Sequence, residues 1–304
     1  MRTAPYREAR VTALADVAAR PRRVAVGTFD GVHLGHREVI RGADTVLTFA
    51  PHPMAVVAPE RAPRLLTSVQ RRAELLGGLG VEELVVVPMD RAFATRSARQ
   101  FVDEVLAGAL WATHVSVGAN FRFGHRARGD AAMLASDGRF TARVVPLLEV
   151  AGEVVCSTAI RDMIAAGRVE EAEALLGAPF ALAGDVSRAD RAGTPGYAVA
   201  AVAVPEGQLT PAAGRYACRV TDARGAHAAV VTVDRPDGSA GDASIVEIVM
   251  RDTGRPRRAD RLRVEFLNRL RSTAAPAAAP CIADRVRAAT PRAGALATRV
   301  TAGA

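Results

Sequence analysis

Short apolar runs recur along the first half of the chain, and their spacing predicts a parallel β-sheet. Five of these runs are rich in β-branched residues and bounded by turn-forming residues, as buried strands are: residues 24–28, 45–49, 83–87, 113–117 and 143–147. Stretches with helical character separate several of them. Strands that alternate with helices predict an α/β fold, in which crossover helices connect the strands of a parallel sheet.

Two of the helical stretches carry specific signals. Residues 67–80 place three leucines on one helical face, Leu75, Leu76 and Leu79. Residues 97–110 open with Ser97 and Gln100 at the spacing of a capping box, in which each side chain accepts a hydrogen bond from the other residue's backbone. The first crossover, about Gly31–Asp44, is so short that its helix must be short as well.

From about residue 183 the pattern changes to successive β-like segments without long helices between them. They are separated by Gly, Pro and Asp and cover residues 197–204, 214–220, 226–233, 244–250 and 260–270. These segments predict a smaller antiparallel barrel after a helical pair at 157–177. We expect three parts: an α/β domain at 1–182, a barrel domain at 183–272, and an Ala/Pro-rich linker and tail at 273–304 with a last helix around 282–289.

Composition narrows the chemistry that the chain can perform. Its 304 residues include 40 basic and 32 acidic ones, a formal charge of +8, and every basic residue is Arg. No lysine is therefore available to bind phosphate, form a Schiff base or act as a nucleophile. The arginines are scattered and only 4% of the residues are aromatic, so we expect no nucleic-acid binding.

Cysteine usage and apolar content indicate a compartment. Three cysteines lie far apart and form no CxxC pair, which fits a reducing environment: Cys156, Cys218 and Cys281. The first residues lack the apolar core of a signal peptide, and no stretch approaches the roughly 20 apolar residues of a membrane span. We expect a cytoplasmic protein without a membrane partner, and the sequence does not indicate an oligomeric state.

The stretch VGTFDGVHLGH, residues 26–36, carries the first candidate chemistry. It follows a predicted strand with a glycine-rich turn, which places backbone N–H groups at the sheet edge where α/β proteins bind ligands. His33 and His36 are three residues apart in a first helical turn, so their rings face the same way. They are suited to donate hydrogen bonds to phosphate oxygens. Zinc is the alternative ligand for such a pair, but no suitable third metal ligand lies nearby.

Three further motifs follow in order. TFAPHP, residues 48–53, ends the second predicted strand, and its alternative interpretation is a proline-fixed loop with an incidental His. VGANFRFGHRARGD, residues 117–130, offers Asn and Phe for a flat ring and Arg for phosphate, although a charged loop anchored by two phenylalanines would look the same. CSTAIR, residues 156–161, places hydroxyls and an Arg at a helix start, where phosphate binding and ordinary capping are both open interpretations.

Taken together with GRVEEAEALLGAPF, the four motifs closely resemble the successive motifs of prokaryotic FAD synthetases, the bifunctional riboflavin kinase/FMN adenylyltransferases, over about residues 24–180. The resemblance implies an amino-terminal Rossmann-like nucleotidyltransferase domain in which ATP and FMN meet at the edge of a parallel sheet. It also implies Mg²⁺, because transfer between phosphate-bearing substrates requires that their charge be neutralised. It assigns no protein ligand to the metal.

The resemblance assigns roles to individual residues. His33 and His36 match the His-x-Gly-His pair that stabilises the α-phosphate of ATP. The implied ATP-binding residues are Gly27, Phe29, Asp30, Gly35, Ser157, Thr158 and Arg161. The implied flavin-binding residues are Pro51, Pro53, Asn120 and Phe123. The chain departs from the family in two places, since Cys156 stands where serine is usual and the segment 37–44 is shorter than the family's first helix.

The carboxyl half resembles, in part, the riboflavin kinase domain of the same family. Where that family carries Gly-Phe-Pro-Thr-Ala-Asn, this chain reads GYAVAA, so Val199 stands at the Thr position and Ala201 at the Asn position. In working kinases these two side chains bind the nucleotide-associated magnesium, and neither Val nor Ala offers the oxygen ligand that Mg²⁺ requires. Glu247 is retained at the position of the general base. The resemblance therefore implies a degenerate kinase site.

We expect the protein to be an FAD synthase that transfers AMP from ATP to FMN, giving FAD and pyrophosphate, with an inactive kinase-like barrel. Three alternatives stay open. In the first alternative, both riboflavin kinase and FMN adenylyltransferase activities persist, the former through an alternative magnesium site in the barrel. In the second alternative, the acceptor is a different phosphate-bearing molecule that receives an adenylyl or a cytidylyl group. In the third alternative, the protein is a catalytically idle, flavin-binding regulator.

Overall fold

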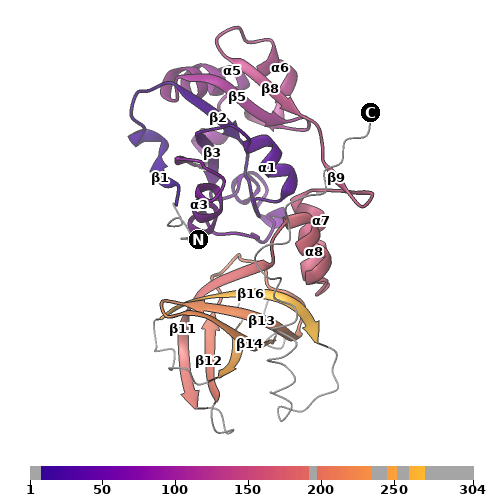
Figure 1. Ribbon diagram of the computed structural model, residues 1–304. Coiled ribbons are helices and arrows are strands. Elements are labelled where there is room, and N and C mark those ends of the chain that lie inside the picture. Colours follow the sequence, from indigo (N-terminus) through magenta and orange to yellow (C-terminus); the bar gives the residue numbers. More distant parts are fainter. Residues whose placement is uncertain (1–7, 192–196, 235–244, 252–259, 271–304) are drawn as a thin grey trace, which may run out of the picture. The chain divides into compact units, whose positions relative to one another are not determined.

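The computed structural model describes residues 8–191, 197–234, 245–251 and 260–270 (Figure 1). The chain forms two compact units. The first contains Met1–Asp162, Ala172–Ala178 and Gly207–Leu209, and the second contains Met163–Glu171, Pro179–Glu206 and Thr210–Ala304. The predicted boundary at residue 182 falls inside a strand, and the tail predicted at 273–304 lies outside the described residues.

In the described part of the first unit, six strands form a parallel sheet in the order β1-β4-β3-β2-β5-β8. The strands are β1 (Arg10–Ala13), β2 (Arg22–Val26), β3 (Thr45–Ala50), β4 (Glu83–Pro88), β5 (Ala112–Gly118) and β8 (Thr141–Val145). The chain runs outward from β2 through β3 to β4 and then crosses back to β5 on the other side of β2. The sheet therefore has a topological switch point between β2 and β5, at which open α/β sheets bind ligands.

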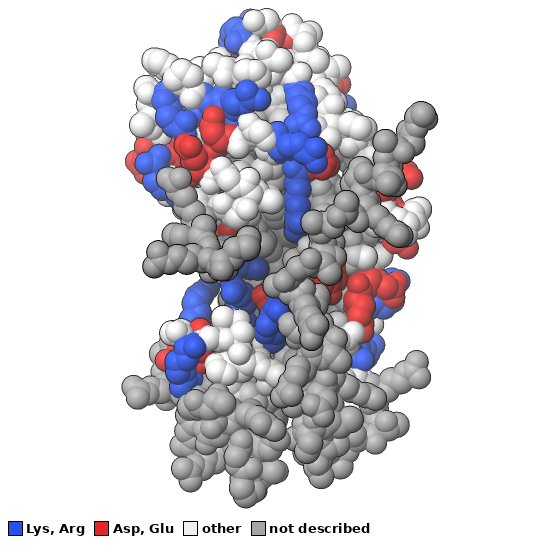
Figure 2. Space-filling model, viewed as in Figure 1, with Lys and Arg blue, Asp and Glu red and all other residues white. Residues whose placement is uncertain are grey.

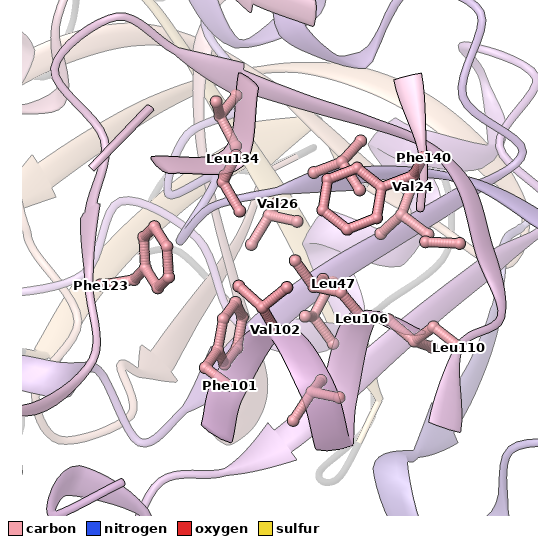
Figure 3. Packing of buried hydrophobic residues seen from close by; sticks show 14 of the residues in the cluster. Val24, Val26, Leu47, Phe101, Val102, Leu106, Leu110, Phe123, Leu134 and Phe140 are labelled. Carbon is pink, nitrogen blue, oxygen red and sulfur yellow. The ribbon is translucent and has the colours of Figure 1, made fainter. Parts of the chain in front are cut away.

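Both faces of this sheet are buried, because successive residues of each strand point to opposite faces. Val24 and Val26 of β2 pack in one apolar cluster, whereas Ala25 between them packs in the other. Three longer helices cover the two faces: α1 (Leu34–Ile40), α3 (Val69–Gly77) and η3 (Phe101–Ala109), a π-helix that continues α5 (Ala98–Gln100). Helices α1 and α3 pack on the Ala25 face. Helix η3 packs on the Val24 face through Phe101, Val102 and Leu106 (Figure 3).

Short elements complete the first unit and lie mostly in the loops that follow the strands. They are η1 (Leu14–Asp16), α2 (Pro53–Val57), η2 (Pro59–Arg61), α4 (Arg91–Ala94), η4 (His125–Ala127) and α6 (Ala131–Ala135). Two hairpins are formed by β6 (Arg122–Phe123) with β7 (Gly129–Asp130) and by β9 (Glu149–Val150) with β10 (Glu153–Val154). Helices α7 (Ser157–Ala165) and α8 (Val169–Leu176) follow, as the helical pair predicted at 157–177.

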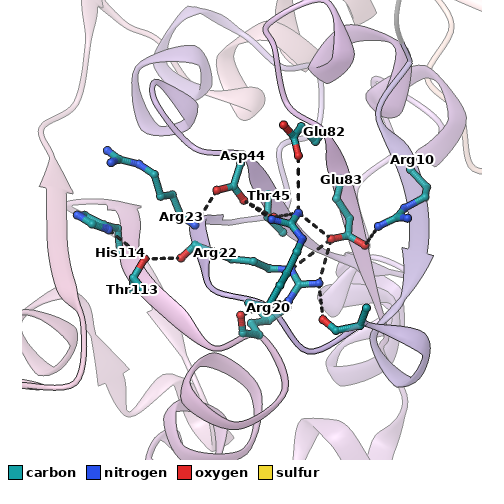
Figure 4. Close-up of polar contacts among 12 residues, drawn as sticks. Arg10, Arg20, Arg22, Arg23, Asp44, Thr45, Glu82, Glu83, Thr113 and His114 are labelled. Carbon is teal, nitrogen blue, oxygen red and sulfur yellow. Dashed lines mark hydrogen bonds and ion pairs between the residues drawn. The ribbon is translucent and has the colours of Figure 1, made fainter.

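A buried ion-pair cluster holds the amino ends of the strands together (Figure 4). Glu83, the first residue of β4, accepts hydrogen bonds from Arg22 at 3.2 Å, from Arg10 at 2.8 Å and from Thr12 at 2.9 Å. The side chains of Arg22 and Glu83 are almost wholly buried. Burial raises the pKa of Glu83, but the hydrogen bonds from Thr12, Arg10 and Arg22 outweigh it and leave the pKa below its ordinary value. The cluster lies at the edge opposite to the carboxyl ends of the strands.

The second unit contains a closed antiparallel barrel, formed in its described part by six strands in the order β11-β12-β15-β14-β13-β16. The strands are β11 (Phe180–Arg191), β12 (Tyr197–Ala203), β13 (Gly214–Asp222), β14 (Gly225–Val233), β15 (Ile245–Arg251) and β16 (Arg261–Leu270). Strand β16 pairs with β11 and closes the barrel. Tyr216 and Phe266 are fully buried with their rings edge to face, and Phe180 packs beside Phe266.

The structure confirms the predicted α/β fold and the antiparallel barrel, and it corrects three details. Helix α3 ends at Gly77, so Leu79 lies beyond the helix and is exposed, while Leu76 is buried as predicted. The sequence pattern did not reveal edge strand β1, and it missed β11, the barrel's first strand. The capping box of Ser97 and Gln100 is present.

On the face of the molecule that Figure 2 shows, basic side chains lie among acidic and uncharged ones. None of the helices in the described part of the chain has the length and apolar character needed to cross a bilayer.

Candidate active site

A cavity of about 1070 Å³ opens where the parallel strands end. Its lining comes from the segments that follow five strands of the sheet: β2, β3, β4, β5 and β8. This is the carboxyl edge, and it includes the switch point between β2 and β5. Cavities that bind a small ligand are typically about 300–1,000 Å³, so this cavity lies at the upper end of that range.

One part of the lining, which we call the histidine end, consists of Gly27, Phe29, His33, Gly35, His36 and Ser157. His33 is the N-cap of α1, and its Nδ1 accepts a hydrogen bond from the backbone N–H of His36 at 3.2 Å. The two imidazole rings are stacked with their centroids 3.5 Å apart, and the ring of Phe29 meets His36 edge to face. The predicted histidine pair is thus brought together at the start of a helix.

Burial disfavours the charged form of both histidines. Burial lowers the pKa of His33 to about 4, with Asp30 opposing the shift and Arg161 and Arg37 adding to it. Burial, followed by the neighbouring His33, Arg161 and Arg72, lowers the pKa of His36 well below its ordinary value.

Hydrogen bonding then fixes where one proton lies. Because Nδ1 of His33 accepts a hydrogen bond, its single proton lies on Nε2, which leaves that N–H as a donor. Nδ1 of His36 is buried and has no hydrogen-bond partner among the described residues. The pair therefore offers uncharged donors in a water-poor position.

Three of the residues expected to bind ATP do not line the cavity. The carboxylate of Asp30 accepts hydrogen bonds from the backbone of Leu66 and Thr67 and forms a 2.7 Å ion pair with Arg161. Arg161 also donates to the carbonyl of Arg64 at 2.9 Å. Asp30 and Arg161 thus hold the loop at 64–67 in place. Thr158 is exposed and also lies outside the lining.

Ser157 lines the cavity and is tied to the loop that follows β2. Its hydroxyl donates to the carbonyl of Asp30 at 2.8 Å, which joins the start of α7 to the loop behind β2. Gly35 is constrained by space, since a Cβ there would lie 3.3 Å from the carbonyl oxygen of Val155 and 3.4 Å from the ring of His33. A side chain at position 35 would therefore make its tightest contact with the Val155 carbonyl and would touch the His33 ring at ordinary van der Waals distance.

Another part of the lining, which we call the aromatic end, consists of Phe49, Phe93, Phe101, Phe121, Phe123 and Asn120. The rings of Phe121 and Phe123 are stacked 5.5 Å apart, and Phe123 also packs against Phe101 in the core. Asn120 is exposed beside them. Of the two prolines expected to contact flavin, Pro53 lines the cavity, whereas Pro51 is exposed and lies outside the lining.

Sequence reasoning missed the segment that follows β4. Met89, Arg91, Phe93 and Arg96 all line the cavity. Phe93 packs against Phe49 and Phe101, and the guanidinium of Arg96 lies 5.0 Å from the centre of the Phe93 ring. A signal was present, because this segment directly follows a predicted strand of the same sheet and so must lie at its carboxyl edge.

The barrel brings together the three positions of the predicted degenerate kinase site. Val199 and Ala201 lie two residues apart on β12, so they share one face, and Glu247 on β15 is paired directly with Ala201. Ala198 and Ala200 are buried on the inner face, and alternation along the strands places Val199, Ala201 and Glu247 on the other face, where Ala201 is buried as well and Glu247 is exposed. Thr232 of β14 is the partner of Glu247 on its other side.

Comparisons with known proteins agree with this two-unit layout. A family model described as FAD synthetase matches residues 16–159, and one described as riboflavin kinase matches residues 176–279. A bifunctional riboflavin kinase/FMN adenylyltransferase of Listeria monocytogenes is 38% identical over 210 residues, which is 64% of this chain and 67% of the relative. The Escherichia coli protein of the same name is 33% identical over 211 residues, 65% of this chain and 67% of its own.

A solved structure is similar to this chain over most of its length. The crystal structure titled as a macrolide-efflux protein from Streptococcus pneumoniae superposes with a TM-score of 0.77 at 26% identity, covering 91% of this chain and 96% of that chain. The fold and the cavity define a two-unit protein with a nucleotidyltransferase-like sheet and a kinase-like barrel. The chain belongs to the bifunctional riboflavin kinase/FMN adenylyltransferase family. This confirms the resemblance noted from the four motifs.

Proposed function

We propose that the first unit transfers AMP from ATP to FMN, giving FAD and pyrophosphate. Membership of the family supports FAD synthesis. The observation that carries the proposal is the stacked pair of histidines at the start of α1, in a cavity that is also lined by a cluster of aromatic side chains. A polyphosphate fits the histidine end and a flat ring fits the aromatic end, and these are the parts that ATP and FMN bring together.

The proposed reaction requires positioning and charge stabilisation only. A phosphate oxygen of FMN attacks the α-phosphorus of ATP, a new P–O bond forms, and the bond to the β-phosphate breaks as pyrophosphate leaves. The Nε2–H of His33 and an N–H of His36 donate to the α-phosphate oxygens, on which charge develops. No covalent enzyme intermediate is needed, and the chain has no lysine to form one.

The donor set favours entry of Mg²⁺ as part of MgATP. Within the described residues, no group of three or more His, Cys, Asp or Glu side chains is placed to hold a metal ion. Asp30 is engaged by Leu66, Thr67 and Arg161. Phosphate oxygens are ordinary ligands of Mg²⁺ and would carry most of its coordination here. The ion would neutralise phosphate charge while the histidines hold the α-phosphate.

We further propose that the barrel does not phosphorylate riboflavin. Val199 and Ala201 lie beside Glu247 on one face of the barrel, and neither side chain can ligate Mg²⁺. Phosphoryl transfer depends on a positioned metal and γ-phosphate, so a base alone is of little use. Thr232 places a hydroxyl next to Glu247, and this favours one second candidate, a kinase with an altered metal site.

One experiment distinguishes these possibilities. The full chain is incubated with MgATP and either riboflavin or FMN, and the flavins are separated by chromatography. FAD from FMN, together with unchanged riboflavin, is the expected result. FMN or FAD formed from riboflavin supports the bifunctional alternative, and flavin binding without any product supports the regulatory one.

A further inference from the structure

Arg72 on α3 is a buried cation next to the histidine end that does not itself line the cavity. Its side chain is only 4% exposed. One terminal nitrogen, Nη1, donates to the carbonyl of Thr28 at 2.7 Å and to Oγ1 of Thr48 at 2.9 Å. Its Nε is buried and has no hydrogen-bond partner within the described residues. The groups that bind this guanidinium are therefore neutral oxygens.

The charge of Arg72 is incompletely balanced within the protein. Asp30 is the carboxylate whose field acts on it, yet Asp30 already forms an ion pair with Arg161 at 2.7 Å. Two guanidinium groups thus share one carboxylate behind the loop at 27–36. Burial lowers the pKa of Arg72 more than Asp30 raises it. A buried charge without a full counter-charge is energetically unfavourable. An anion that binds nearby therefore gains a favourable electrostatic interaction that no group of the protein already satisfies.

The contact with Thr28 also orients the backbone of the cavity. The carbonyl of Thr28 accepts hydrogen bonds from both Arg72 and Thr48. Since the carbonyl and N–H of one trans peptide point in opposite directions, this anchor turns the N–H of Phe29 away from Arg72. No backbone hydrogen bond joins that N–H to another described residue. Both Thr28 and Phe29 line the cavity.

We propose that Arg72 is a positioning residue for a polyphosphate. It fixes the Thr28–Phe29 peptide, and its positive charge is balanced by the phosphates of a nucleotide bound at the histidine end. This inference rests on the proposed function only in taking ATP as the ligand. It predicts that the contribution of Arg72 to binding grows with the number of phosphates on the ligand.

The test measures binding of adenosine, AMP and MgATP to the full chain by calorimetry. Arg72→Gln keeps a hydrogen-bond donor but removes the charge, and Arg72→Lys keeps the charge. Arg71→Gln on the same helix is the matched control, because Arg71 is also largely buried but pairs with Glu74 and does not line the cavity. We expect Arg72→Gln to weaken MgATP binding by roughly 10-fold or more while adenosine binding stays within about 2-fold. Arg72→Lys and Arg71→Gln should bind MgATP nearly as the wild type does.

Equal losses for adenosine and MgATP in Arg72→Gln would show a purely structural role and overturn the inference, as would unchanged MgATP binding. If Arg72→Gln does not fold, Arg72→Lys decides, and a 10-fold loss of MgATP affinity with the charge retained contradicts the proposal. A wild-type chain that binds no MgATP would instead contradict the proposed function, so the two failures are distinguishable.

Discussion

His33 serves the helix and the cavity with different atoms of one ring. Its Nδ1 caps α1 by accepting from the backbone of His36, and this contact leaves Nε2–H as the donor toward a ligand. His36 stacks on that ring and has an unpartnered Nδ1 among the described residues. The local fold therefore prepares both donors before any substrate arrives, which is how preorganised sites lower a barrier.

Replacing His36 tests the role of the pair. His36→Ala is expected to lower turnover by roughly 10²–10³, because a donor aimed at developing charge acts mainly in the transition state. Binding of MgATP should change little. Initial rates of FAD formation and calorimetric affinities measure the two effects. An unchanged rate would remove the histidine pair from the mechanism.

The low pKa of His33 makes stability depend on pH. Its pKa is about 4 in the folded chain and 6.5 when exposed, so the unfolded chain binds the extra proton between these values. Stability should therefore fall as pH drops from about 6.5 to about 4, by roughly 3 kcal/mol from this residue.

The measurement is urea unfolding at pH 7 and at pH 4.5 for the wild type and for His33→Asn, which keeps an N-cap acceptor without a titrating ring. The wild type should lose more of its free energy of unfolding over this interval than the variant does. Parallel losses in the two proteins would contradict the account of His33.

Asn120 offers the cleaner test of the aromatic end, because Phe123 is also part of the core. Asn120→Ala should weaken FMN binding by about 5-fold or more and leave MgATP binding within about 2-fold, since one polar contact to the ring is lost. Fluorescence titration with FMN and calorimetry with MgATP compare the two. Similar losses for both ligands would sink the assignment of this end to flavin.

At the scale of elements, the sheet holds the cavity at one edge and the Glu83 cluster at the other (Figure 4). Glu83→Gln leaves the buried guanidinium of Arg22 without its carboxylate and should lower the free energy of unfolding by roughly 3–5 kcal/mol. Glu82→Gln is the control, because Glu82 is largely exposed and its ion pair with Arg20 is long, at 4.0 Å. Chemical denaturation measures both. A loss below 1 kcal/mol for Glu83→Gln would show that the cluster does not stabilise the sheet.

The pattern of the sequence predicted elements well where one physical signal dominated. Runs of β-branched residues predicted the buried parallel strands. The capping box of Ser97 and Gln100 predicted a helix start that the structure contains. Strand β1 gave no such signal, because this four-residue edge strand has an exposed pattern. Leu79 was misassigned because the glycines at 77 and 78 end α3 before its periodicity does.

The same contrast holds for the candidate site. His33, His36, Gly35 and Ser157 lie where their motif positions place them, since a loop between a strand and a helix leaves little freedom. Asp30 and Arg161 lie behind the cavity wall, because their partners come from the distant loop at 64–67. The sequence did not indicate a role for Arg72, since an arginine inside a helix of mixed polarity is expected to be exposed on the surface.

At the scale of the whole molecule, the chain joins a nucleotidyltransferase-like unit to a barrel that carries Val199 and Ala201 beside Glu247. This combination leads us to expect FAD synthesis from FMN alone. Riboflavin phosphorylation would then have to come from another enzyme.

The most direct test of the central claim is the stoichiometry of products from FMN and MgATP with the purified full chain. The account predicts one FAD and one pyrophosphate for each FMN consumed, at a rate that His36→Ala lowers by roughly 10² or more. Absence of FAD, or FAD formed equally fast by His36→Ala, would contradict it.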